Sequence, residues 1–358
     1  PRHSATVEEW DADPWLLNTP GGIIDLKRGG MGPHRRDRRM TKVTTATPKG
    51  ESPEWAKFLE NVTGGDKELQ LYLQRVVGYC LTGDISTHAL FFLYGTGANG
   101  KSVFVNVIST ILGDYAANAP MDTFMETRTD RHPTDLAGLR GARFVSATET
   151  EQGRRWNESK IKAITGGDLV TARLMHQDFF TYTPQFKLLI AGNHKPAIRN
   201  IDEAMRRRMH LIPFTITVPP EKRDPLLTEK LLAERDGILA WALQGCLLWQ
   251  QQGLKQPLSV TSATDEYFES EDAMGRWMDE RCNLGANHKA MTTTLFADWK
   301  QWAEVNGEFA GSQRRFSDAL ITRRFDKWRN SSGVRGFVGI DIKQPTNFSN
   351  RGYPYNDN

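Results

Sequence analysis

The chain of 358 residues carries a formal net charge of +3, and 39% of its residues are hydrophobic and 25% charged. This length predicts two or three domains, and the composition is ordinary for a soluble globular protein. No apolar run approaches the roughly 18 residues of a transmembrane helix, no signal-peptide pattern opens the chain, and the three cysteines form no CxxC pair. We therefore expect no membrane span, zinc ribbon or disulfide framework, and we expect a reducing compartment.

The first 85 residues contain two segments with different patterns. Residues 1–50 are rich in Gly, Pro and Arg, and the stretch from Trp15 to Leu26 predicts a small β-hairpin around a Pro-Gly-Gly turn. Residues 51–85 predict two helices, the first capped by Ser52 and the second by Asp66. We interpret this second segment as a helical module of the oligomerisation type that leans on the next domain.

The most informative motif is the glycine-rich segment at residues 95–102. The apolar run 89–94 predicts one buried parallel strand, and a helical pattern begins after residue 102. The glycines allow backbone N–H groups to surround a phosphate, Lys101 would reach the β- and γ-phosphates, and Ser102 would hold Mg²⁺. The motif therefore predicts a nucleoside triphosphate site, and the alternative is a glycine-rich turn. The full P-loop pattern reads Gly95-Thr96-Gly97-Ala98-Asn99-Gly100-Lys101-Ser102.

Two further buried strands are predicted to end in polar residues that suit phosphate chemistry. The strand 142–147 leads into Glu149 and Glu151, and a carboxylate there can hold the Mg²⁺ shell and polarise the attacking water. Glu149 is the first choice and Glu151 the neighbour that shares the work, while the alternative is a solvated acid. The strand 186–192 ends in Asn193, which can bind the γ-phosphate or the water, or simply form a turn.

A predicted hairpin and an arginine series complete this part of the sequence. Two alternating segments, 169–175 and 179–183, predict a β-hairpin with His176 at its tip near Arg173. Three consecutive arginines, 206–208, precede another strand. An arginine placed across a subunit boundary could stabilise charge on the transferred phosphoryl group, and the alternative is a basic surface loop.

The last third of the chain predicts helices followed by a strand. The apolar pattern of 221–256 predicts a helical lid, and residues 257–345 predict three helices and the strand 337–343. This order resembles a winged-helix module. Residues 346–358 predict a flexible tail. The residues of this module that we expect to contact DNA lie in or near its third helix. They are Arg314, Arg315, Arg323 and Arg324.

Taken in order, these motifs resemble the superfamily 3 helicases, which are AAA+ motors. The likeness is strongest to phage and plasmid primase-helicases related to the poxvirus primase-helicase. It covers nearly the whole chain, and outside the P-loop only the ordered set is specific. The residues that carry it are 17–22, 95–102, 149–151, Lys162 with 165–168, 191–196, and Arg207-Arg208 ahead of 212–214.

This resemblance implies an α/β fold with an AAA+ P-loop core at 86–220, and an ATPase that needs Mg²⁺ and assembles as a ring, usually a hexamer. ATP would lie between subunits, with Glu149 as the Walker B acid and Asn193 as sensor 1. Arg207 or Arg208 would act in trans; Arg207 is favoured, with Arg206 also open. The DNA-contact candidates in and near the hairpin are Lys162, Arg173 and His176, although no lysine adjoins His176.

The function expected from the resemblance is a replicative DNA helicase of a phage, plasmid or integrated element, in the bacterial host cytoplasm. Family members often carry a primase domain ahead of this region, and nothing in these residues resembles one, so priming would belong to a missing N-terminal part, to a partner or to no part. Two alternatives stay open at this point. One is an initiator that binds double-stranded origin DNA and melts it locally; the other is a small-molecule P-loop kinase.

Overall fold

The computed structural model describes residues 6–127, 134–149, 153–175, 177–198 and 201–343. Contacts divide the chain into two compact units, Pro1–Phe268 and Glu269–Asn358. The second unit thus begins later than the predicted boundary at residue 257. Within the described residues, no helix has the length and apolar character needed to cross a bilayer.

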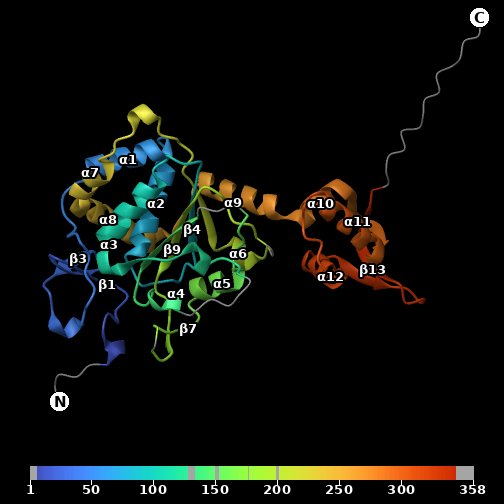
Figure 1. Cartoon of the computed structure of the whole chain (residues 1–358), viewed down its shortest axis with the longest axis horizontal. Coiled ribbons are helices and arrows are strands. Elements are labelled where there is room, and N and C mark those ends of the chain that lie inside the picture. The colour runs from blue at the N-terminus through green and yellow to red at the C-terminus, as the bar shows by residue number, and fades with distance from the viewer. Residues whose placement is uncertain (1–5, 128–133, 150–152, 176, 199–200, 344–358) are drawn as a thin grey trace, which may run out of the picture. The chain divides into compact units, whose positions relative to one another are not determined.

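A five-stranded parallel sheet forms the centre of the first unit (Figure 1). The strand order is β10-β4-β9-β6-β5, so that β9 lies between the P-loop strand β4 and the strand β6. All four strand pairs are parallel, which confirms the predicted parallel sheet. The bounds are β4 Leu90–Tyr94, β5 Ala116–Asn118, β6 Phe144–Glu149, β9 Lys187–Gly192 and β10 Met209–Pro213.

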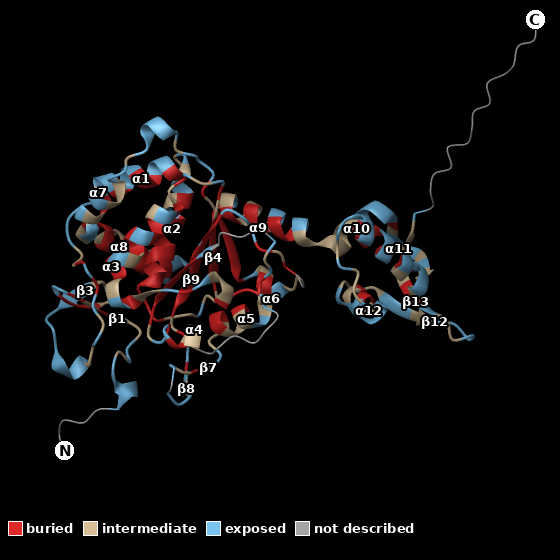
Figure 2. Cartoon of the chain, in the orientation of Figure 1, coloured by how far each residue is buried: buried red, intermediate tan, exposed pale blue. Residues whose placement is uncertain are grey.

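Helices cover both faces of this sheet, because alternate residues of its strands belong to two different cores. Phe91 and Leu93 of β4 pack in the core formed with α1, α2, α3, α7 and α8. Leu90 and Phe92 pack in the core formed with α4, α5, α6 and α9. The strands are therefore buried on both sides, as their near-continuous apolar runs predict (Figure 2). The helices are α1 Pro53–Thr63, α2 Lys67–Cys80, α3 Lys101–Leu112, α4 Thr134–Ala137, α5 Glu158–Gly166, α6 Glu203–Arg206, α7 Leu227–Ala233, α8 Arg235–Gln252 and α9 Leu258–Glu271.

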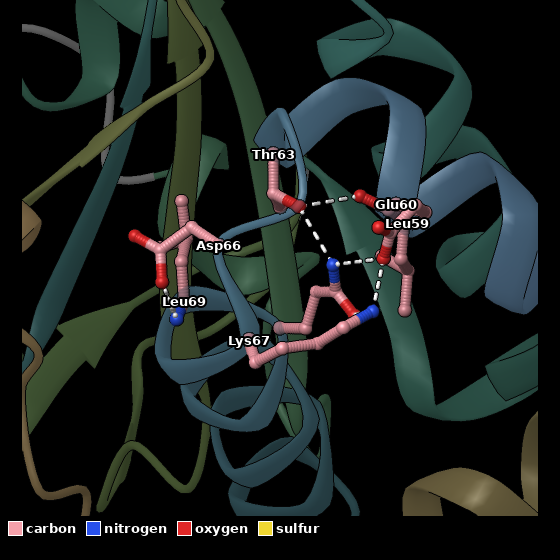
Figure 3. Close-up of polar contacts among 7 residues, drawn as sticks. Leu59, Glu60, Thr63, Asp66, Lys67 and Leu69 are labelled. Atoms are coloured by element: carbon pink, nitrogen blue, oxygen red, sulfur yellow. Dashed lines mark hydrogen bonds and ion pairs between the residues drawn. The ribbon is translucent and has the colours of Figure 1, made fainter.

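The corner between α1 and α2 is fixed by side-chain caps (Figure 3). Asp66 caps α2 by accepting a hydrogen bond from the Leu69 N–H at 2.9 Å. The Gln70 amide donates to both Glu60, at 2.9 Å, and Thr63, at 3.0 Å. These contacts set the direction of α1, whose buried face reaches the P-loop.

Two smaller antiparallel sheets complete the first unit. The predicted N-terminal hairpin is present as β1 (Leu16–Thr19) and β2 (Gly22–Asp25), extended by β3 (Gly30–Gly32). The second hairpin consists of β7 (Val170–Ala172) and β8 (Phe180–Tyr182), and its strands are shorter than predicted. Single 3₁₀ turns lie at Val7–Glu9, Arg36–Arg38, Gly113–Tyr115, Met121–Thr123 and Pro220–Lys222.

The second unit has the order helix, strand, helix, helix, strand, strand around a small aromatic core. Its sheet is antiparallel, with the order β11-β13-β12. Asp272 separates α9 from α10, and its side chain caps α10 by accepting a hydrogen bond from the Gly275 N–H at 3.0 Å. Of the three strands of this unit only β13 was predicted, and β11 and β12 were not. The elements are α10 Ala273–Arg281, β11 Cys282–Met291, α11 Thr292–Val305, α12 Gln313–Thr322, β12 Asp326–Arg329 and β13 Arg335–Ile342.

A buried histidine makes the stability of the first unit depend on pH. The His210 ring lies 2.6 Å from the Tyr72 hydroxyl and 3.2 Å from the Gln256 amide, and burial lowers its pKa from 6.5 to about 4. Between these values the unfolded chain binds more protons, so acid removes stability that is fully present above pH 6.5. We expect His210 to account for a loss of about 3 kcal/mol at most as the pH falls to 4.

Urea denaturation across this pH range, on the wild type and His210→Gln, tests this expectation. Other groups titrate in both proteins, so only the difference between their pH profiles reports on His210. The variant should lose less stability on acidification. Parallel profiles would show that the histidine does not titrate as expected.

Candidate active site

The P-loop connects the end of β4 to the start of α3 and is shaped by close backbone contacts. Gly97 and Gly100 have φ of 106° and 84°, values that favour glycine. At Gly95 an added Cβ would lie 2.0 Å from the Phe214 carbonyl oxygen. At Gly100 it would lie 2.5 Å from Val62 of α1. The loop is therefore held between the segment after β10 and the helix α1.

Lys101 and Asn99 form a hydrogen-bonded network inside this loop. The Lys101 ammonium donates to the Gly95 carbonyl at 2.8 Å, to the Asn99 side-chain oxygen at 2.9 Å and to the Asn193 side-chain oxygen at 3.1 Å. The Asn99 amide donates in turn to the Phe214 carbonyl at 2.6 Å. The network thus connects the ends of β4, β9 and β10.

The charge of Lys101 is held by neutral oxygens. Only 5% of the residue is exposed, and burial lowers the pKa of its ammonium. Among the described side chains, no carboxylate forms an ion pair with it. A buried cation that is hydrogen-bonded to neutral oxygens favours an anion nearby, and the first turn of α3 adds its N-terminal dipole at the same place. Ser102 is exposed in that turn.

The parallel register brings the predicted catalytic residues to one edge of the sheet. Gly192 of β9 pairs with Tyr94 on one side and with Glu149 on the other. Asn193 follows Gly192 and contacts Lys101, so two predicted residues from distant segments meet. Glu149 is the last residue of β6, and only its backbone is described; Glu151 lies outside the described residues. Their predicted roles stay predictions.

The three arginines at the end of α6, residues 206–208, have different environments. Arg206 lies 3.5 Å from the Asp265 carboxylate and 4.9 Å from the Phe268 ring. Arg208 is buried and donates to the Thr165 hydroxyl at 3.1 Å and the Ala204 carbonyl at 2.9 Å. Burial, followed by the neighbouring Arg207 charge, lowers the pKa of Arg208. Arg207 is exposed and has no ion pair within the described part of the chain. The structure thus separates residues that the sequence leaves equivalent.

The residues expected to contact DNA in the first unit are also in distinct settings. Lys162 forms an ion pair with Asp202, the residue that caps α6. Arg173 lies over the Phe179 ring at 4.9 Å, on the β7–β8 hairpin, which extends from the body of the unit (Figure 1). His176 lies outside the described residues.

In the second unit, the four predicted arginines do not form one cluster. Arg323 forms an ion pair with Asp272, whereas Arg314 lies in a groove between α12 and the β12–β13 ribbon. Arg315 and Arg324 are exposed. Two further features of the site were not predicted from the sequence. One is the bridging role of Asn99, and the other is Lys195, whose ammonium lies 4.2 Å from the centre of the Tyr94 ring.

Comparison with known proteins identifies relatives among large DNA viruses. Residues 1–64 match a family described as "D5 N terminal like", and residues 93–208 match a family of unknown function. The chain is 26% identical over 325 residues to "Putative helicase L207/L206" of Acanthamoeba polyphaga mimivirus, covering 83% of this chain and 34% of that protein. It is 26% identical over 319 residues to "Putative helicase 022R" of Frog virus 3, covering 82% and 32%. It is 19% identical over 330 residues to "Putative primase C962R" of African swine fever virus, covering 83% and 34%.

The fold has a counterpart among solved structures. The apo structure of the NrS-1 C terminal region matches with a TM-score of 0.53 at 12% identity, covering 92% of this chain and 83% of that one. The D5-like family match and the viral relatives named putative helicase or primase therefore confirm the resemblance to primase-helicases, and the solved structure bears out the fold alone. The chain spans about a third of the length of the curated relatives it matches.

The different environments of Arg207 and Arg208 predict different effects on stability. Arg208→Ala removes one hydrogen bond to the Thr165 hydroxyl and one to the Ala204 carbonyl and empties a buried position, so the free energy of unfolding should fall by about 2 kcal/mol. Arg207→Ala should change it by less than about 0.5 kcal/mol. Urea denaturation at neutral pH measures both. Equal losses in the two variants would mean that Arg208 is not the structural residue.

Proposed function

We propose that the first unit binds and hydrolyses ATP with Mg²⁺ and uses the energy to move DNA as a helicase. The observation that carries this proposal is the contact between Lys101 of the P-loop and Asn193 at the end of the adjacent strand. A glycine turn alone needs no such partner. The names of the viral relatives, helicase and primase, support a function in DNA replication.

The proposed roles follow from the position of each residue. Backbone N–H groups of Gly95–Ser102 bind the phosphates, and Lys101 exchanges neutral oxygen partners for phosphate oxygens. Ser102 and Glu149 hold Mg²⁺, which in proteins commonly takes one or two protein oxygens together with phosphates and waters. Glu149, with Glu151, polarises the attacking water, and Asn193 orients it.

We further propose an AAA+ motor of superfamily 3 that works as a hexameric ring. Arg207 is the residue supplied to the neighbouring subunit, because it is exposed and has no ion pair within the described residues. Arg208, in contrast, is hydrogen-bonded to Thr165 of α5 in its own subunit. The β7–β8 hairpin contacts single-stranded DNA in the ring. Within this proposal, the second unit is a winged-helix-like module, an interpretation supported by its order of helices and strands.

The proposed host context is that of a phage, plasmid or integrated element in a bacterial cytoplasm. A primase activity, if it accompanies this motor, is assigned to another part of the protein or to a partner. These assignments derive from the motif resemblance.

The ATPase reaction itself provides the first test. Lys101→Ala should lower ATP turnover by about 100-fold or more, because the lysine stabilises charge that develops on the phosphates. Single-stranded DNA should stimulate the wild-type turnover. Phosphate release with and without an oligonucleotide measures both effects, with Lys300→Gln, an exposed lysine of the second unit, as control. Turnover that DNA leaves unchanged would contradict the helicase proposal.

A mixing experiment tests whether the arginine acts between subunits. Lys101→Ala and Arg207→Ala should each be inactive alone. In a mixture, an intact P-loop from the Arg207 variant meets an intact arginine from the Lys101 variant, so turnover should recover in part. No recovery at any ratio, with both variants still assembled, would assign the arginine to its own subunit or to no catalytic role.

A further inference from the structure

Ion pairs within the second unit neutralise some of its cations and not others. Three arginines are neutralised within the unit: Arg276 by Glu308 and Arg281 by Asp298, both at 2.6 Å, and Arg323 by Asp272. Of the cations that form no ion pair within the described residues, four line one groove: Arg314, Lys327, Arg329 and Arg335.

This groove lies between α12 and the β12–β13 ribbon and has a volume of about 770 Å³. In the ribbon, Lys327 is directly opposite Phe337, and Arg329 is directly opposite Arg335. Paired positions of a β-ladder share one face of the sheet. Phe337 is 1% exposed and packs in the core of the unit, so the three ribbon cations share the face that carries the core.

The charge in this groove is not required by the fold. Like charges directly opposite each other on an antiparallel ladder are destabilising, and Arg329 and Arg335 are such a pair. Asp318 is the one carboxylate among the lining residues, against four cations. An arrangement that costs stability and leaves a positive excess points to an anionic ligand.

The aromatic residues of the groove indicate which ligand is favoured. Proteins that bind single strands without sequence preference combine basic grooves with exposed aromatic rings on which bases stack. Here Phe337 is buried, the Trp328 ring has the Lys289 ammonium 4.1 Å from its centre, and the Trp328 indole N–H donates to the Phe337 carbonyl at 3.2 Å. With these rings occupied, the groove presents cations, which suit the phosphates on the outside of a duplex.

We propose that the groove between α12 and the β12–β13 ribbon binds the phosphate backbone of double-stranded DNA through Arg314, Lys327, Arg329 and Arg335. This inference rests on the proposed function only in that the protein acts on DNA. It adds a duplex site, independent of ATP, to the single-strand contacts of the motor. Three of its four cations were not among the predicted DNA contacts.

The test is the salt dependence of duplex binding by the full chain without nucleotide. Fluorescence anisotropy with a labelled duplex would compare the wild type, Arg335→Gln and Arg329→Gln/Arg335→Gln. Each lost phosphate contact should reduce the slope of log affinity against log salt by about one, so the double variant should lose about two. Lys300→Gln, which removes an exposed charge of α11 outside the groove, should keep the wild-type slope. An unchanged slope in the double variant would overturn the proposal.

Thermal unfolding separates binding from folding. Removing one of two opposed arginines relieves repulsion, so Arg335→Gln should unfold at the same temperature or higher. A lower midpoint that accompanies weaker binding would mean that the arginines serve the fold. A single strand of the same length should lose less affinity than the duplex, and an equal loss would overturn the assignment to duplex DNA.

The result is independent of the motor. If the groove variants keep wild-type duplex binding while single-stranded DNA still stimulates ATP turnover, the groove proposal fails and the helicase proposal stands. If duplex binding falls as expected but DNA never stimulates turnover, the groove proposal stands and the helicase proposal fails.

Discussion

The position of one buried ammonium determines much of the first unit. Lys101 is held by three neutral oxygens from the start of the P-loop, from Asn99 and from Asn193. The Asn99 amide also donates to the carbonyl of Phe214, the residue that follows β10, so the end of this strand is held beside the loop as well. Because a buried charge is costly unless its donors are satisfied, the ends of three strands must stay within hydrogen-bond reach of each other. That requirement defines the edge of the sheet at which we locate chemistry.

The sheet order brings the P-loop, Asn193 and Glu149 to one edge. With β9 between β4 and β6, Asn193 follows the central strand of the three, between the P-loop and Glu149. Because Lys101 donates directly to Asn193, a movement of the Lys101 ammonium changes the hydrogen bonding of Asn193 with no other residue between them. On the opposite side, the caps of the α1–α2 corner hold Val62 against Gly100, so the loop is supported by the helical module as well. Thr165 and Arg208 connect the next helix pair in a similar way.

Features encoded by local sequence could be predicted, and features that depend on long-range contacts could not. The apolar run before Gly95 and the helical pattern after Ser102 fixed the strand, loop and helix, because each has its own short-range signal. The strand β11 has a polar, half-exposed sequence and exists because β13 pairs with it. The burial of Arg208 beside exposed Arg207 depends on Thr165, which is distant in sequence. The ion pair between Lys162 and Asp202 is likewise tertiary, and it occupies a lysine expected to contact DNA.

We propose that the nucleotide site is completed by a neighbouring subunit. Sedimentation velocity during ATP turnover, with single-stranded DNA present, measures this most directly, because it reports the size of the species that is active. Wild-type protein should then sediment as a closed oligomer, and turnover per chain should rise with protein concentration as that oligomer forms. A monomer with full, DNA-stimulated turnover at every concentration would contradict it.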